Sequence, residues 1–107
     1  MKPETRVFLI ETLVPLGKRN GKIVLHICNS RLWGTLELFG EQQPFNGSLT
    51  CPNQITLWGK LKTALSTLDY TAAGFFTNET ITFEIHTKKG IFPTYGTFYE
   101  ENEGKAK

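Results

Sequence analysis

The side chains best able to do chemistry are few and scattered along the chain. There are two histidines, His26 and His86, and two cysteines, Cys28 and Cys51. Imidazole and thiolate groups are the usual ligands of zinc, so these four residues are the natural candidates for a metal site. However, their spacing contains no Cys-x-x-Cys or His-x-x-x-His pair. The pattern indicates surface histidines and free thiols, and we expect no metal and no cofactor.

The carboxylates give no better sign of catalysis. Asp69 is the only aspartate, and three glutamates lie in the polar segment EENEGKAK, residues 100–107. Glu37 and Glu84 fall at outward positions of expected strands, where solvent makes a carboxylate a poor general acid. The sequence also contains no glycine-rich phosphate-binding loop. We therefore expect a protein that is not an enzyme.

An aromatic ring and two positive charges share one face of the segment TLWGKLKT, residues 56–63. Trp58 with Lys60 and Lys62 is the combination that binds single-stranded nucleic acid by stacking and charge. The net charge of +2 is small, and the sequence matches no RNA-binding motif. Outward lysines also commonly pair with acidic residues across a sheet. Nucleic acid is therefore not the expected partner, and weak single-strand binding by these three residues is kept as an alternative.

The elements that must position these residues are strands. Apolar and polar residues alternate, most clearly in ITFEIHT, and turn-forming groups such as RNGK, CPN and KKG separate the alternating runs. RNGK contains an Asn-Gly pair that is typical of a hairpin turn. The predicted strands lie near residues 5–14, 22–28, 32–39, 46–51, 54–62, 67–76, 80–87 and 91–99.

Short links between eight strands predict an antiparallel meander. Because side chains just fill the interior of an eight-stranded barrel, and closure removes exposed sheet edges, we expect an all-β domain with a closed or nearly closed barrel. A β-sandwich is one alternative. Another is an α+β fold, because KLKTALSTL, residues 60–68, has helical apolar spacing. We expect one domain over residues 1–107, with frayed ends at 1–4 and 100–107.

Composition and hydropathy bound the class of protein. Hydrophobic residues make up 39% and charged residues 21% of the chain, as in ordinary globular domains. Charged residues interrupt the apolar stretch that a secretory signal needs within MKPETRVFLIETLVPL. No run approaches the roughly 18 apolar residues of a membrane helix. We expect a soluble cytoplasmic protein that does not interact with membranes.

The phrase Leu-Trp-Gly-x-Leu occurs twice, at residues 32–36 and 57–61. Weaker versions, AAGFF and TYGTF, add two further strand glycines. Glycine inside a strand permits a bend or a close approach between backbones, which a small barrel needs. We therefore predict this role for Gly34, Gly59, Gly74 and Gly96. The alternation then places the preceding Trp33 and Trp58 on the outer face.

The first predicted strand, TRVFLIETLV, is apolar on both faces and needs cover on both. Together with outward aromatic rings, this predicts an apolar outer surface of the kind that binds partners. Self-association as a two-fold homodimer is the leading functional expectation. A covering tail explains the same pattern, and a barrel that binds a small apolar ligand is an alternative. The candidate binding or interface residues are Trp33, Trp58, Lys60, Lys62, Tyr95, Phe8 and Ile10.

Overall fold

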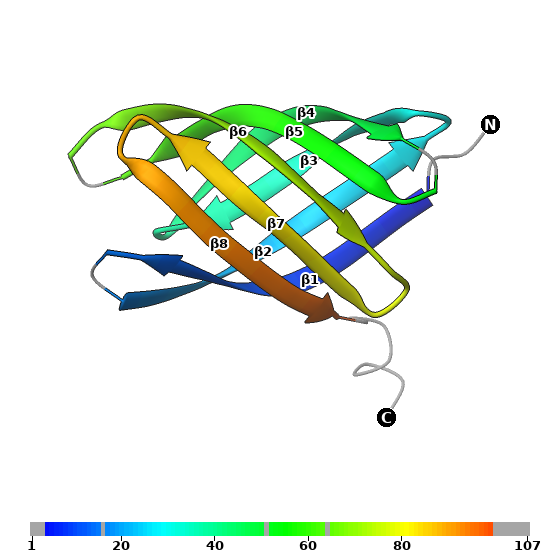
Figure 1. The fold of residues 1–107 in the computed structure, drawn as a ribbon, viewed down its shortest axis with the longest axis horizontal. Helices are drawn as coiled ribbons and strands as arrows, with labels where there is room; N and C mark the ends of the chain where they lie inside the picture. The colour runs from blue at the N-terminus through cyan, green and yellow to red at the C-terminus, as the bar shows by residue number, and fades with distance from the viewer. Residues whose placement is uncertain (1–3, 16, 51, 64, 100–107) are drawn as a thin grey trace.

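The computed structural model describes residues 4–15, 17–50, 52–63 and 65–99. Within these ranges all regular structure is strand, and no helix long and apolar enough to cross a membrane occurs. Successive strands pair antiparallel, and β8 pairs back with β1 to close an eight-stranded barrel (Figure 1). The strands are β1 (Glu4–Val14), β2 (Gly17–Cys28), β3 (Arg31–Leu38), β4 (Glu41–Thr50), β5 (Gln54–Lys62), β6 (Thr67–Phe76), β7 (Thr80–Thr87) and β8 (Gly90–Phe98).

This architecture confirms the predicted all-β meander and closed barrel. The sandwich alternative is wrong because one sheet closes on itself. The helix alternative at residues 60–68 is also wrong: β5 runs to Lys62 and β6 begins at Thr67. Glu4, expected in the frayed N-terminal end, belongs to β1 and pairs with Ile27. The rest of the expected frayed ends, residues 1–3 and 100–107, lies outside the described residues.

The turn predicted at RNGK lies inside a strand instead. Asn20 and Gly21 belong to β2, opposite Glu11 and Ile10 of β1. A Cβ atom at position 21 would lie 2.0 Å from a backbone oxygen of β3, so this glycine permits a close approach between strands. The first hairpin turns between Val14 and Gly17 instead, and the φ of 127° at Gly17 favours glycine. Because the chain turns before Gly17, β2 begins there and not near residue 22, where its alternation predicts the start.

Bulky side chains alternate with glycines around the inner face of the barrel. One inner row runs, in register, through Leu25, Gly34, Phe45, Gly59 and Tyr70. A Cβ atom at Gly34 would lie 1.8 Å from a backbone oxygen of β2 and 3.2 Å from the ring of Phe45. The close-approach role predicted for Gly34 is therefore confirmed, and the aromatic ring that covers this glycine lies inside the barrel.

The middle of the barrel is filled by apolar side chains that are at most 9% exposed. Two buried threonines, Thr12 and Thr94, face each other across the β1–β8 seam with their hydroxyl oxygens 3.0 Å apart. This hydrogen bond satisfies both hydroxyls where the barrel closes. The core consists of Phe8, Ile10, Ile23, Leu25, Ile27, Leu32, Leu36, Leu38, Phe45, Ile55, Leu57, Leu61, Tyr70, Ala72, Ile81, Phe83, Ile85 and Phe92.

Pro93 ends the hydrogen-bond ladder between β8 and β1. Amides along β8 alternate in direction: the amide of Phe98 donates toward β7, whereas that of Tyr99 donates to β1. Every second position before Tyr99 therefore faces β1, and Pro93 occupies one of these positions without an N–H group. The last register pair of this seam joins Thr12 to Thr94, and Thr94 is the residue that follows Pro93 in the chain.

Pro44 ends the β4–β5 ladder in the same way. The amide of Leu49 donates to Ser30 on the β3 side, so the even-numbered positions of β4 face β5. Pro44 is one of them, and the register of this seam stops at Phe45 with Gly59. The two seams lie on opposite sides of the closed barrel. Pairing of β2 with β3 and of β6 with β7 also stops before this end, at Lys22 with Glu37 and at Thr71 with His86. The four hairpins, and with them the halves β1–β4 and β5–β8, therefore diverge at the end that carries the β1–β2, β3–β4, β5–β6 and β7–β8 turns, at the left of Figure 1.

Candidate functional site

Trp33 lies on the outer face of β3 and is half-buried. The ring of His26, its register partner on β2, lies 5.6 Å away between ring centroids at an interplanar angle of 34°. The Nδ1 atom of His26 is in turn 2.9 Å from the hydroxyl oxygen of Thr5. This histidine covers Trp33 from a neighbouring strand, so the Trp33 ring packs within the barrel's own surface and offers little area to a partner.

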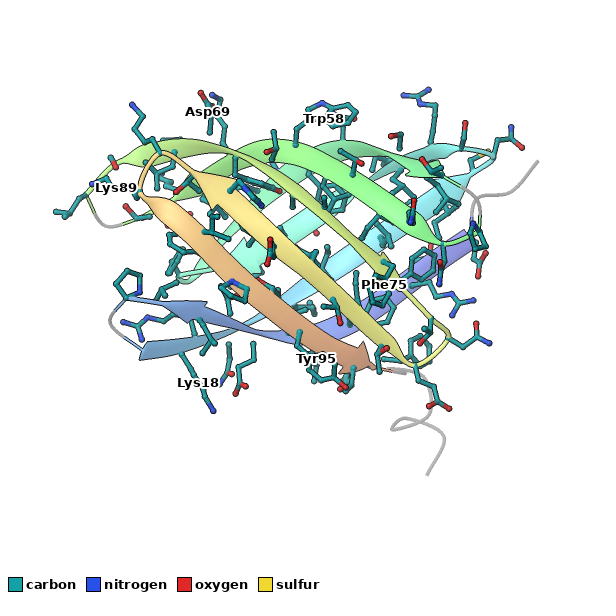
Figure 2. The ribbon with its side chains drawn as sticks, in the orientation of Figure 1. Lys18, Trp58, Asp69, Phe75, Lys89 and Tyr95 are labelled. Carbon is teal, nitrogen blue, oxygen red and sulfur yellow. The ribbon has the colours of Figure 1, made fainter. Side chains whose placement is uncertain are left out.

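Trp58 is more accessible, with 46% of its surface exposed. It projects from the upper edge of the barrel in Figure 2, beside Asp69. The Nζ atom of Lys60 lies 2.5 Å from Oδ1 of Asp69, and this lysine holds the pKa of the Asp69 carboxyl below its ordinary value. One of the two lysine charges next to the ring is therefore paired, which leaves the exposed Lys62 as the other charge for a phosphate.

Phe8 and Ile10 are not surface residues, and their prediction as interface candidates is wrong. They point into the barrel and are 0% and 4% exposed. Phe8 packs edge to face against Phe98, with 6.1 Å between ring centroids. The outward apolar residues of β1 are its alternate positions instead: Leu9 is 47% and Leu13 is 49% exposed.

Tyr95 stands on the outer face of β8 and is 53% exposed. It lies between two surface hollows of about 450 and 410 Å³, one lined by Leu9 and the other by Leu13. In Figure 2 it projects from the lower edge of the barrel, opposite Trp58. The candidate residues thus form two separate surfaces, one on β3–β5 and one on β8–β1, where a single patch was expected.

Among the described residues the two histidines are not brought together, and His86 has only Glu84 beside it, with His86 Nε2 3.4 Å from Glu84 Oε1. His26 lies on β2 and His86 on β7, and no three His, Cys, Asp or Glu side chains in the described part of the chain are placed to hold a metal ion. Cys51 lies outside the described residues. Burial raises the pKa of the Tyr70 hydroxyl above its ordinary value, which keeps it neutral. That hydroxyl has no hydrogen-bond partner among the described residues, so Tyr70 is a core residue with no described group placed to exchange its proton.

A cleft of about 440 Å³ lies at the end of the barrel where the halves diverge, and its lining is more apolar than that of the two hollows beside Tyr95. Its floor contains the buried side chains of Leu68 and Phe92, and both halves of the barrel contribute to its walls. Two positive charges reach it, and none of the described residues that line it is acidic. The lining residues are Val14, Pro15, Arg19, Phe39, Thr63, Leu65, Ser66, Leu68, Lys89 and Phe92.

Threonine hydroxyls fix the two turns on the β5–β8 side of this cleft. Thr63 Oγ1 accepts hydrogen bonds from the amides of Leu65 and Ser66, at 3.2 and 3.1 Å. Leu65 is held at the rim of the cleft with 91% of its surface exposed. In the β7–β8 turn, Thr87 Oγ1 accepts from the amide of Lys89 at 2.9 Å. These local hydrogen bonds stabilise turns independently of the rest of the fold.

Arg19 approaches the cleft from the other half of the barrel. It sits near the start of β2, opposite the inward-facing Thr12 of β1, and is partly buried. Its Nη1 atom donates to the backbone oxygen of Lys18 at 3.0 Å. That contact orients the guanidinium group but leaves most of its five N–H donors for another acceptor.

Sequence reasoning missed this cleft. The sequence shows Pro44 and Pro93 and a repeated Thr-x-x-Ser/Thr/Gly pattern at three turns. Whether a proline ends a ladder depends on which neighbouring strand its position faces. That information lies in the register.

No protein-family model, curated protein or solved structure matches the chain.

Proposed function

We propose that this protein binds a small apolar molecule in the cleft at the divergent end of the barrel. The volume of about 440 Å³ falls within the range of small-molecule pockets. The residues that line the cleft come from all four hairpins at this end, so a ligand there would contact both halves of the barrel. The cleft with its apolar floor is the single observation that carries this proposal.

Solvation favours occupancy of the cleft. Leu65 exposes 91% of its surface at the rim, above the side chains of Phe92 and Leu68. Covering apolar surface contributes about 25 cal/mol for each Å² removed from water. The core side chains fill the middle of the barrel, so the ligand is held at the mouth and remains partly exposed.

The first experiment is a fluorescence titration with phenylnaphthylamine, a neutral apolar dye whose emission rises when it leaves water. We expect saturable binding of one dye per chain. Leu65→Ser should weaken this binding about tenfold, because part of an apolar contact is lost. The substitution should leave the stability of the fold unchanged, since the side chain is already exposed.

Leu9→Ser is the matched control, because Leu9 is an exposed leucine that does not line the cleft. It should bind the dye as the unaltered protein does. A dye signal that does not saturate contradicts the proposal, and so does an equal loss of affinity in the two variants.

The outer surface around Tyr95 favours a second candidate function, self-association. Leu9, Leu13 and Tyr95 are each about half exposed and lie on the adjacent strands β1 and β8. Tyr95 protrudes between two hollows, so a second copy related by a two-fold axis has both a ring to offer and a hollow to receive one.

Light scattering at increasing concentration tests this candidate. We expect a mass approaching twice that of one chain, and we expect Tyr95→Ser to return the protein to a monomer. Trp58→Ser, which removes a similarly exposed ring from the opposite surface, should not change the mass. A monomeric mass for the unaltered protein at high concentration rules self-association out.

A further inference from the structure

Resting on the proposed function, we infer that the ligand is an apolar acid whose anionic head group lies between Arg19 and Lys89. Both side chains line the cleft, and they come from opposite halves of the barrel. The apolar floor beneath them accounts for the rest of the ligand. The two parts together fit an amphiphile with one anionic head group, such as a carboxylate or a phosphate monoester on a hydrocarbon tail.

The charges of the described lining residues are unbalanced. Arg19 and Lys89 are positive, no described acidic side chain lines the cleft, and neither cation has an acidic partner within 4 Å among the described residues. Glu41 begins β4 at the same end of the barrel but does not line the cleft. An anion between the two cations would gain Coulomb energy, and more so in a partly buried site than in bulk water.

The chemistry of Arg19 favours an oxygen acid in particular. A guanidinium group presents parallel N–H donors that match two oxygens of a carboxylate or phosphate. Lys89 adds a single flexible charge from a turn that Thr87 fixes through the Lys89 amide. Arg19 lies on the β1–β2 side and Lys89 on the β7–β8 side of the β1–β8 seam. This seam is open at this end because Pro93 ends the ladder.

A membrane surface is the competing interpretation of an exposed leucine next to basic residues. The placement of Arg19 and the apolar floor inside a concave cleft favours a single small molecule instead. Binding to vesicles is therefore measured as a separate outcome.

The experiment compares two dyes with the same ring system. Phenylnaphthylamine is neutral, and anilinonaphthalene sulfonate adds a negative charge. We expect Arg19→Gln and Lys89→Gln each to weaken binding of the anionic dye about fivefold more than binding of the neutral dye. Added salt should weaken only the anionic dye.

Lys88→Gln is the matched control, because Lys88 lies next to Lys89 in the same turn but does not line the cleft. It should bind both dyes as the unaltered protein does. Equal losses in the Lys88 and Lys89 variants would overturn the head-group assignment, as would a protein that binds the two dyes alike. Failure to bind the neutral dye would instead overturn the proposed function itself.

Competition with natural head groups completes the test. Dodecanoate and dodecyl phosphate should both displace the neutral dye, whereas dodecanol should displace it less well. Stronger displacement by one of the two acids identifies the source of the charge and supports the inference. Binding to phosphatidylglycerol vesicles without displacement by either monomeric acid overturns it in favour of a membrane surface.

Discussion

At the scale of single residues, the barrel depends on positions where a side chain is missing. The inner face alternates bulky residues with glycine, and Phe45 fills the space beside both Gly34 and Gly59. The sequence predicts these two glycines as equivalent, because both follow Leu-Trp. The structure distinguishes them by the distance that a Cβ atom would have to the neighbouring backbone.

Alanine substitutions at these positions test the packing. A Cβ atom at Gly34 would lie 1.8 Å from the backbone oxygen of Val24, whereas one at Gly59 would lie 3.0 Å from that of Pro44. We expect Gly34→Ala to lower the free energy of unfolding by about 3 kcal/mol and Gly59→Ala by about 1 kcal/mol. Urea denaturation measures both, and equal losses would contradict the closer approach of the neighbouring backbone at Gly34.

At the scale of elements, the alternation of apolar and polar residues predicts most of the strands well. It fails at the start of β2 and β4, where Asn20, Gly21 and Pro44 are residue types that favour turns. Those residues remain in strands because each pairs in register with one neighbouring strand, Asn20 and Gly21 with β1 and Pro44 with β3. The outward placement of Trp58 also follows from alternation, but the cover that His26 gives Trp33 does not, because it depends on a partner from another strand.

At two of the four seams that stop short of the divergent end, β1–β8 and β4–β5, a proline removes the next backbone donor. Pro93→Val supplies the missing N–H group at a position that faces β1. We expect the ladder to extend toward Leu13, with a gain in stability of about 1 kcal/mol for the added hydrogen bond. The cleft should narrow, so that binding of the neutral dye weakens.

Hydrogen exchange and dye titration check this together. The new amide at position 93 should be protected from exchange, and the dye affinity should fall. Pro52→Val, in the turn between β4 and β5 at the other end of the barrel, should leave the affinity unchanged. A protected amide with unaltered dye binding would show that the open seam does not form the binding site.

At the scale of the whole molecule, the barrel has a filled middle, a divergent end and two exposed aromatic surfaces on opposite sides. The sequence predicts the filled middle and the exposed rings, because these follow from which residues alternate. It does not predict the cleft, because that site joins Arg19, Leu65 and Phe92 from three different hairpins. Their proximity follows only from closure of the barrel and from the seams at which pairing stops.

The most direct test of the proposed binding site is a map of backbone amide chemical shifts during titration with the neutral dye. The account predicts shifts at Phe39, at Leu65 to Leu68 and at Lys89 to Phe92, with none at Trp58 or Tyr95. Shifts centred on Tyr95 or Trp58, with the turns at the divergent end unchanged, would contradict it.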